Sequence, residues 1–367
     1  MDTTVASTAL FVNENLEFQV LHLPRPPEPA EGELLIETHF SGANPADIKH
    51  AIFLGIYPAI IGYEFSGKVV KTSSASKFRP GDIVAGYTPS GIQRPLKYGT
   101  HQRYLVCPED MAFLVSASMP QHHAACLPVV AMTAAGALYN IFKFRVPYAE
   151  GNDKTSRPLL IWGASSGVGL CAVQFAHASG IYPIIVTASP ERHSLLRELG
   201  ATCCFDYKST DIVSNIQAAV QDYQCGELDC GFDAAGTAGK TSSAGKTSSA
   251  GKTSSAEMMA QCLPSDATLV STVVQNDPRF KTPWAASNRD LVLRINGVHE
   301  VRIPAQPNSQ WRAWECLLWA VENYGVKFRL PSVEVFAGTA EEALEQIKLL
   351  ADQQRGFGKL ALQHPLH

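Results

Sequence analysis

The stretch LLIWGASSGVG, residues 159–169, decides the fold. It opens with an apolar run of the kind that forms a buried strand, and glycines follow where the chain must turn. From residue 165 small and apolar side chains recur at helical spacing as far as Gly180, a glycine that ends the helix. A strand, a glycine-rich turn and a helix in this order begin a β-α-β unit.

The same alternation continues toward the C-terminus. Strand-like and helix-like runs follow one another at 184–188, 190–200, 203–207, 210–223, 228–236 and 267–274. The run at 190–200 has Pro190 in its first turn and Gly200 just past its end, where these residues favour helix boundaries. Alternating strands and helices predict a parallel, doubly wound sheet, so we expect an α/β fold here.

The first third of the chain has a different pattern. Short apolar or alternating runs lie at 34–40, 65–72, 82–88 and 101–107, separated by Gly, Pro and Asp turns. Such runs predict a barrel-like β domain.

The chain beyond the parallel sheet returns to mixed character. It has helical patterns at 310–324 and 339–354 and a last strand at 358–363, which we expect to rejoin the β-rich domain. The predicted division is one domain from residues 1–130 and 295–367 and a second domain from residues 131–294.

Composition excludes several classes of function. The 367 residues are 46% hydrophobic and 17% charged with a net charge of −4, so no basic surface for nucleic acid is expected. No apolar run reaches the roughly 20 residues that span a bilayer, and the polar N-terminal residues are unlike a signal peptide. Nine scattered cysteines form neither a disulfide framework nor a metal-binding pattern, which favours a reduced, cytoplasmic protein.

One segment stands apart from both domains. GKTSSA occurs three times in tandem over 239–256, without a large apolar residue, and we predict a flexible loop. The GKT triplet is reminiscent of a phosphate-binding loop, but the glycine spacing and the repetition do not fit that motif. A repeat expansion or an insertion explains it better, since a longer surface loop costs only about 0.6 kcal/mol per doubling of its length.

The glycine turn at 163–169 is typical of a dinucleotide site. Glycine lets the backbone turn tightly and approach a pyrophosphate, while the start of the next helix offers unpaired N–H groups. Ser165 and Ser166 add hydroxyl donors. The strand and helix around the turn make this motif meaningful, because turns elsewhere also use glycine.

The end of the second strand distinguishes NAD from NADP. An NAD site usually has an acid there, which bonds the ribose 2′-hydroxyl. This chain has Ser189, which does not repel a 2′-phosphate, and Arg192 follows close by. Glu191 comes after Pro190 and suits the first turn of a helix, where the helix dipole favours an acid. We therefore expect NADPH, although Arg192 could also be an ordinary solvated helix residue.

These features, with four motifs in the first third, resemble a known family. The motifs are SGANPADIK (41–49), IGYEFSG (61–67), RPGDIV (79–84) and GTHQRY (99–104). Together with the glycine turn they resemble the zinc-free, quinone-oxidoreductase-like branch of the medium-chain dehydrogenase/reductase superfamily. The NPxDxK form and the strand-end Ser-Pro resemble more narrowly the trans-acting enoyl reductases of fungal polyketide biosynthesis.

The resemblance implies a GroES-like β-rich catalytic domain made of both termini, a Rossmann domain between them, and substrate in the cleft. It implies catalytic roles near the nicotinamide for Lys49 and Thr133. The cofactor residues that it implies are Asp47, Lys49, Gly163, Ser165, Ser166, Gly167, Val168, Gly169, Ser189, Pro190, Glu191, Arg192, Tyr207, Gly358 and Lys359. The substrate residues are Leu293, Arg294, Ile295, Asn296 and Gly297.

Three of these residues also have plain structural explanations. Lys49 could be a surface lysine, Thr133 a helix cap or core residue, and Tyr207 an aromatic side chain at a strand end.

Metal ligands are not expected. Catalytic zinc needs cysteine and histidine ligands with one open position. This chain has Asn44 where a ligand cysteine is expected and Tyr63-Glu64 in place of His-Glu. The adjacent His122 and His123 point to different sides of a helix, so we predict a zinc-free protein.

Without a metal to polarise a ketone, hydride addition to an activated double bond is the easier reaction. We expect an NADPH-dependent enoyl reductase that delivers hydride to the β-carbon of an α,β-unsaturated polyketide thioester. The alternatives are a quinone or enone reductase acting on free small molecules, and a redox-silent scaffold protein. An enoyl reductase of this kind implies an acyl carrier protein as partner and a monomer as the preferred state. No residue is identified as the proton donor.

Overall fold

The computed structural model describes residues 7–149, 155–237, 253–284 and 288–367. The chain forms two compact units. The first unit contains Met1–Val129, Arg289–Ala305 and Leu330–His367, and the second contains Val130–Asn288 and Gln306–Arg329. No helix in the described ranges is long and apolar enough to cross a membrane.

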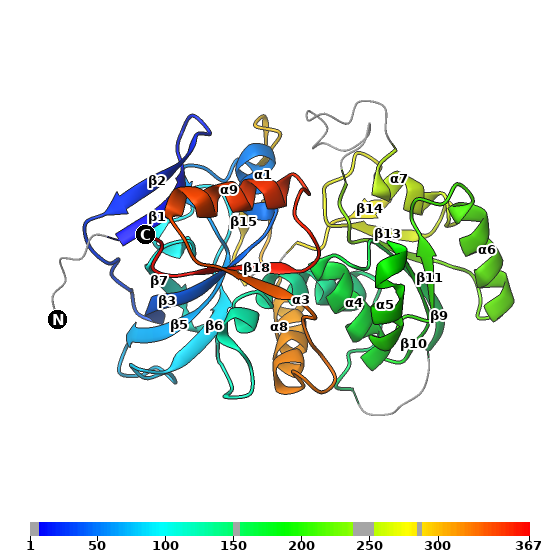
Figure 1. Ribbon diagram of the computed structural model, residues 1–367, viewed down its shortest axis with the longest axis horizontal. Helices are drawn as coiled ribbons and strands as arrows, with labels where there is room; N and C mark the ends of the chain where they lie inside the picture. Colours follow the sequence, from blue (N-terminus) through cyan, green and yellow to red (C-terminus); the bar gives the residue numbers. More distant parts are fainter. Residues whose placement is uncertain (1–6, 150–154, 238–252, 285–287) are drawn as a thin grey trace. The chain divides into compact units, whose positions relative to one another are not determined.

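The first unit is built from antiparallel strands. A three-stranded sheet has the order β2-β1-β4 and a seven-stranded sheet the order β17-β18-β3-β5-β6-β8, with β7 also paired to β3. The C-terminal strand β18 (red) runs beside β3 (blue), so the two ends of the chain share one sheet (Figure 1). The strands are β1 Ser7–Val12, β2 Phe18–Leu23, β3 Glu33–Ala43, β4 Ala59–Ile60, β5 Glu64–Lys71, β6 Ile83–Tyr87, β7 Tyr104–Pro108, β8 Ala112–Leu114, β17 Val333–Phe336 and β18 Lys359–Gln363.

Short helices and a hairpin complete the first unit. Helix α9 begins with a capping box, in which Thr339 and Glu342 satisfy each other's backbone N–H groups. Its apolar face buries Leu344 and Ile347 in a core shared with α1 and the small sheet. The elements are α1 Ala46–Leu54, η1 Leu96–Tyr98, η2 Glu109–Met111, α2 Gln121–Ala124, the hairpin β15 Leu291–Ile295 with β16 His299–Ile303, and α9 Ala340–Ala351.

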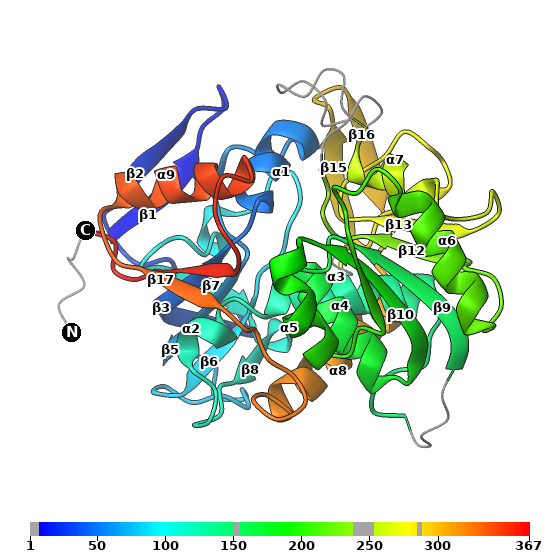
Figure 2. The same cartoon turned by 45° about the vertical axis from the view of Figure 1, so that its right-hand side comes forward.

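The second unit contains a parallel sheet with the order β11-β10-β9-β12-β13-β14. Numbered along the chain this is 3-2-1-4-5-6, the Rossmann order, and it reverses direction between β9 and β12. Figure 2 shows β9, β10, β12 and β13 side by side. The strands are β9 Thr155–Trp162, β10 Ile181–Ala188, β11 Cys203–Asp206, β12 Cys230–Asp233, β13 Thr268–Ser271 and β14 Phe280–Lys281.

Helices pack on this sheet because its strands are apolar on both sides. Leu160 and Trp162 of β9 share a buried core with Ile216 of α6 and Met259 of α7. The alternating residues of β9 point to the other face of the sheet. The helices of the unit are α3 Pro128–Ala135, which starts at the boundary, η3 Gly136–Ile141, α4 Gly167–Ala178, η4 Pro190–Arg192, α5 His193–Glu198, α6 Ile212–Tyr223, α7 Ser255–Ala260 and α8 Pro307–Glu322.

The expected fold class is confirmed: a GroES-like β-rich unit is combined with a Rossmann unit. The division of the chain differs from the predicted one at residues 306–329, which were placed in the β-rich domain and lie in the second unit. The reason is packing. Asn140 Nδ2 donates to the Ser309 carbonyl over 2.9 Å, and the ring of Trp319 lies 6.2 Å from that of Phe175. Residues 289–294 lie in the first unit instead of the second.

The prediction of a loop over 239–256 is wrong at its C-terminal end. Ser254 is the N-cap of α7, and Ser255 and Ala256 are the first residues of the helix. The Glu257 side chain completes a capping box with Ser254, which starts the helix inside the last GKTSSA copy. Residues 238–252 lie outside the described residues.

Candidate functional site

The turn after β9 requires glycine at two positions. Gly163 has a φ of 78°, and a Cβ there would lie 2.5 Å from the Cβ of Ala235. A Cβ on Gly169 would lie 2.6 Å from the Gly163 carbonyl oxygen. The turn is therefore closed by contacts that a side chain would block, as in a dinucleotide-binding fingerprint.

The helix that follows the turn presents free N–H groups. Ser166 is the N-cap of α4, and its Oγ accepts the Gly169 N–H over 3.0 Å. The first N–H groups of the helix, at Gly167 and Val168, have no carbonyl within the helix to bond. These donors and the positive end of the helix dipole fit a pyrophosphate.

The two serines of the turn have different roles. The Ser166 hydroxyl donates to the Ala234 carbonyl oxygen over 2.9 Å while it caps the helix, so it is not the free phosphate donor that we expected. The Ser165 side chain is half-buried, and its hydroxyl forms no hydrogen bond within the described part of the chain. Ser165 therefore remains the candidate hydroxyl donor to the cofactor.

The predicted adenosine-end residues follow the carboxyl ends of neighbouring parallel strands. Ser189 to Arg192 come directly after β10, and Tyr207 comes directly after β11. Ser189 is half-buried, and Tyr207 is 43% exposed. Because the strands are parallel, these residues lie at the same edge of the sheet as the glycine turn. Lys208, with its Nζ 5.6 Å from the Tyr207 ring centroid, is a further cation at this edge that the sequence analysis missed.

Asp233, at the end of β12, was also missed. It is fully buried and accepts the Ala235 and Gly236 N–H groups over 3.2 Å each and the Ser271 hydroxyl over 2.9 Å. Burial raises the pKa of Asp233 above its usual value, against the opposing effect of its hydrogen bonds. An acid inside the apolar run at 228–236 was the available signal for a buried polar site.

A buried ion pair lies in the first unit. Lys359 Nζ donates to Glu64 Oε1 over 2.9 Å, to Asn44 Oδ1 over 2.6 Å and to the Ala43 carbonyl over 3.1 Å. Burial alone would lower the pKa of Lys359, but the charge and hydrogen bond of Glu64, together with the nearby Cys126 and Asp47, outweigh it and the pKa is raised. The ammonium group has three N–H donors and all three are used. The Lys359 side chain is therefore part of this network, and a cofactor contact would have to come from its backbone.

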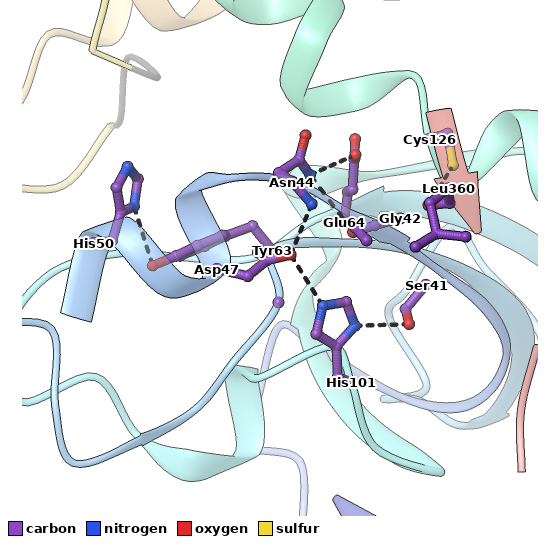
Figure 3. A network of polar contacts seen from close by, with 12 residues as sticks. Ser41, Gly42, Asn44, Asp47, His50, Tyr63, Glu64, His101, Cys126 and Leu360 are labelled. Atoms are coloured by element: carbon purple, nitrogen blue, oxygen red, sulfur yellow. Dashed lines mark hydrogen bonds and ion pairs between the residues drawn. The ribbon is translucent and has the colours of Figure 1, made fainter. Parts of the chain in front are cut away.

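Asp47 belongs to the same region (Figure 3). Its Oδ2 accepts the Asn44 N–H over 2.7 Å and lies 3.1 Å from His101 Nε2. The other ring nitrogen of His101 lies 2.8 Å from Ser41 Oγ, which in turn lies 2.7 Å from His364 Nε2. Oδ1 of Asp47 is buried without a hydrogen-bond partner among the described residues. One carboxylate oxygen thus anchors the start of α1, and the other is buried within the first unit.

The remaining predicted residues of the nicotinamide end lie on separate elements. Lys49 is half-buried on α1, where burial lowers the pKa of its ammonium group and the charge of Asp352 opposes this. Thr133 is partly buried on α3. Gly358 has a φ of 113°, and a Cβ there would lie 2.7 Å from Ser332 Oγ.

The predicted substrate residues form one side of a hairpin. Leu293, Arg294 and Ile295 lie on β15, and Asn296 and Gly297 turn toward β16 with φ values of 53° and 72°. The Asn296 N–H donates to the Phe53 carbonyl over 2.8 Å, which ties the turn to the end of α1. The substrate role of this hairpin stays a prediction.

Among the residues that the structure describes, no group of three or more His, Cys, Asp or Glu side chains could hold a metal ion. The Asn44 and Glu64 side chains, at positions where zinc ligands were considered, are bonded to each other over 2.8 Å and to Lys359. A lysine ammonium group thus supplies the positive charge beside Glu64. The absence of zinc stays a prediction.

The comparisons with known proteins agree with this geometry. Residues 30–117 match the alcohol dehydrogenase GroES-like domain, and residues 167–282 match the zinc-binding dehydrogenase domain. The chain is 33% identical over 215 residues to trans-enoyl reductase himH of Aspergillus japonicus, and 33% identical over 224 residues to trans-enoyl reductase tndF of Aspergillus flavipes. These matches cover 53% and 56% of this chain, and 62% and 64% of those relatives.

Solved structures share the fold over nearly the full chain. The quinone oxidoreductase from Coxiella burnetii has a TM-score of 0.68 at 20% identity, over 98% of this chain and all of that one. A Rossmann unit with a glycine turn, joined to a GroES-like unit, defines a nicotinamide-dependent oxidoreductase fold. The chain belongs to the medium-chain dehydrogenase/reductase superfamily.

Proposed function

We propose that this protein is an NADPH-dependent enoyl reductase that reduces the double bond of an α,β-unsaturated thioester. The observation that carries the proposal is the glycine turn at the start of α4, whose free N–H groups suit a pyrophosphate, together with Ser189 at the end of β10. Similarity to proteins named trans-enoyl reductases supports the choice of an enoyl substrate.

The bound nicotinamide would supply the hydride that adds to the β-carbon of the substrate. The N–H groups of Gly167 and Val168 would hold the pyrophosphate, together with the Ser165 hydroxyl. Ser189 and Arg192 would bind the 2′-phosphate, Tyr207 would lie on the adenosine side, and Lys208 would add positive charge. Asp47 would contribute to the cofactor site, and Thr133 would be a further donor near the nicotinamide.

Lys49 is the candidate for stabilising the charge that develops on the thioester oxygen. Hydride addition turns the substrate into an enolate-like species, and a donor placed at its oxygen lowers the barrier most in a water-poor site. The Lys49 ammonium group is half-buried and has no carboxylate within salt-bridge distance in the described ranges. A half-buried cation of this kind gains most from a developing negative charge.

Stopped-flow loss of NADPH absorbance tests the function. Crotonyl thioesters and longer enoyl thioesters should oxidise NADPH, and NADH should react more slowly. No oxidation at any chain length would eliminate the enoyl reductase, and turnover of free quinones or enones instead would identify the alternative reductase. A chain that does not bind NADPH in a fluorescence titration would be the redox-silent scaffold.

The proposal implies a partner that carries the substrate. Relatives named trans-enoyl reductases suggest an acyl carrier protein of a polyketide synthase, which meets a monomer of this chain transiently. Enoyl groups on a carrier protein should then be reduced with a higher kcat/KM than the same groups on a short thiol. An equal kcat/KM would argue against the carrier.

Ser189→Asp should weaken NADPH binding at least tenfold, because an acid at the end of β10 repels a 2′-phosphate. NADH has no such phosphate, so its Kd should change by less than about threefold. Fluorescence titration of both cofactors gives the ratio. Ser118→Asp, at an exposed serine of the first unit, adds the same charge and serves as the control. Equal weakening of NADPH and NADH by Ser189→Asp would contradict the NADPH assignment.

A further inference from the structure

The segment Asp233–Thr237 touches the glycine turn in two places. The Ala234 carbonyl accepts the hydroxyl of Ser166, the residue that caps α4. Ala235 packs so tightly on Gly163 that a Cβ on the glycine would lie 2.5 Å away. The position of the turn, and hence of the N–H groups at the start of α4, depends on where this segment lies.

Asp233 holds the segment in place. Its Oδ1 accepts the N–H groups of Ala235 and Gly236, two and three residues further along the chain, over 3.2 Å each. Its Oδ2 accepts the hydroxyl of Ser271 over 2.9 Å from the neighbouring strand β13. A buried carboxylate with this many donors fixes the backbone around it, since each lost donor would leave charge unsatisfied.

The last GKTSSA copy completes this arrangement. The Ser255 hydroxyl accepts the Thr237 N–H over 3.0 Å, and it lies close enough to the Asp233 carboxylate to lower the pKa of that group. In return the Ser255 N–H donates to Thr237 Oγ1 over 2.8 Å. Ser255 therefore ties the Thr237 end of the segment to the first turn of α7, and its hydroxyl faces the Asp233 carboxylate at the other end.

Only one copy of the repeat can take this role. Every copy contains Ser-Ser-Ala, but only Ser254 is followed three residues later by an acid, Glu257. The equivalent positions after the earlier copies are Gly245 and Gly251, which have no side chain to complete a capping box. The capping box thus determines which copy starts α7 and places its second serine, Ser255, against Thr237.

We propose that Asp233 and Ser255 are positioning residues for the dinucleotide, and that the last GKTSSA copy alone has this role. The inference rests on the proposed function, because it acts through the N–H groups that would hold the pyrophosphate. It assigns the repeat tract a place in the cofactor site through Ser255, and it leaves the first two copies dispensable.

Ser255→Ala tests the proposal. We expect the Kd and the KM for NADPH to rise about tenfold, and kcat at saturating NADPH to stay within about twofold, because the reacting atoms are untouched. Ser255→Thr keeps the hydroxyl and should restore binding. Hydrogen exchange at residues 163–169 of the cofactor-free protein should speed up in Ser255→Ala, and this readout needs no cofactor. Unchanged exchange and unchanged Kd would overturn the proposal.

Ser254→Ala is the matched control from the same copy. It removes the N-cap of α7 and should lower stability, but it keeps the Ser255 hydroxyl that bonds Thr237, so the Kd for NADPH should stay within twofold. An equal loss of binding in Ser254→Ala would mean that the helix alone matters and would overturn the role of Ser255.

Deleting residues 239–250 removes two copies and keeps the last one. The shortened protein should bind NADPH within twofold of the full chain. Weaker binding would overturn the assignment to the last copy alone. If the full chain bound no dinucleotide while exchange at 163–169 still responded to Ser255→Ala, the proposed function would fail and the positioning of the turn would stand.

Discussion

Lys359→Met should lower the free energy of unfolding by about 3–5 kcal/mol. Lys359 is 8% exposed and Glu64 is completely buried, so methionine in place of the lysine leaves a carboxylate in the interior with no positive charge beside it. The carboxylate keeps only the Asn44 amide and the Val129 N–H as donors. Denaturant unfolding at pH 7 measures the loss.

Two further variants separate the buried charge from the loss of packing. Glu64→Gln combined with Lys359→Met removes both charges and should recover a large part of the stability, because the cost lies in the unpaired charge. Lys71→Met breaks an exposed ion pair with Glu28 and should cost less than about 1 kcal/mol. A double variant as unstable as Lys359→Met alone would show that packing of the lysine stem dominates.

The Rossmann unit was the more predictable part of the fold. Its strands and helices alternate, Pro190 and Gly200 mark the two ends of one helical run, and the glycine turn is local in the sequence. The placement of α8 was not predictable in the same way. Its periodicity indicates an apolar face. That face packs its Trp319 ring near Phe175, and Asn140 bonds the backbone of its first turn, but no local pattern in the sequence indicates partners so distant along the chain.

The candidate site likewise contains residues that local sequence predicts and residues that depend on contacts between distant parts of the chain. The sequence placed Ser189 and the glycine turn at strand ends, because strand order and motif spacing are local properties. It missed the role of Ser166, whose partner Ala234 comes 68 residues later, and the pairing of Lys359 with Glu64 across 295 residues. Such hydrogen bonds arise only when the sheets assemble. The Ser-Ser-Ala-Glu sequence at 254–257, in contrast, fits the capping-box pattern of a helix N-terminus. Local sequence alone could have predicted this helix start, but the repeat was interpreted as one uniform loop.

Acidification from pH 7 to 5 should lower the free energy of unfolding by about 2 kcal/mol through His364 alone. His364 is 7% exposed, its Nε2 bonds the Ser41 hydroxyl, and its Nδ1 is buried without a hydrogen-bond partner in the described ranges. Burial, helped by the nearby His101, lowers the pKa of His364 from 6.5 to about 3. The pKa of His364 is lower in the folded protein than in the unfolded chain. At pH values between the two pKa values, His364 is therefore protonated in the unfolded chain and neutral in the folded protein. The stability is therefore complete above the unfolded pKa and declines as the pH falls below it.

His364→Gln keeps a polar partner for Ser41 and removes the titration. Its stability between pH 7 and 5 should fall by about 2 kcal/mol less than that of the unmodified protein, whatever the two stabilities are at pH 7. Between pH 7.5 and 8.5 the two curves should run parallel, since the histidine is neutral in both the folded and the unfolded chain there. Denaturant unfolding at each pH measures both curves. Identical slopes below pH 7 would mean that His364 is protonated inside the folded protein, and its site beside Ser41 would then have to admit water or a counter-charge.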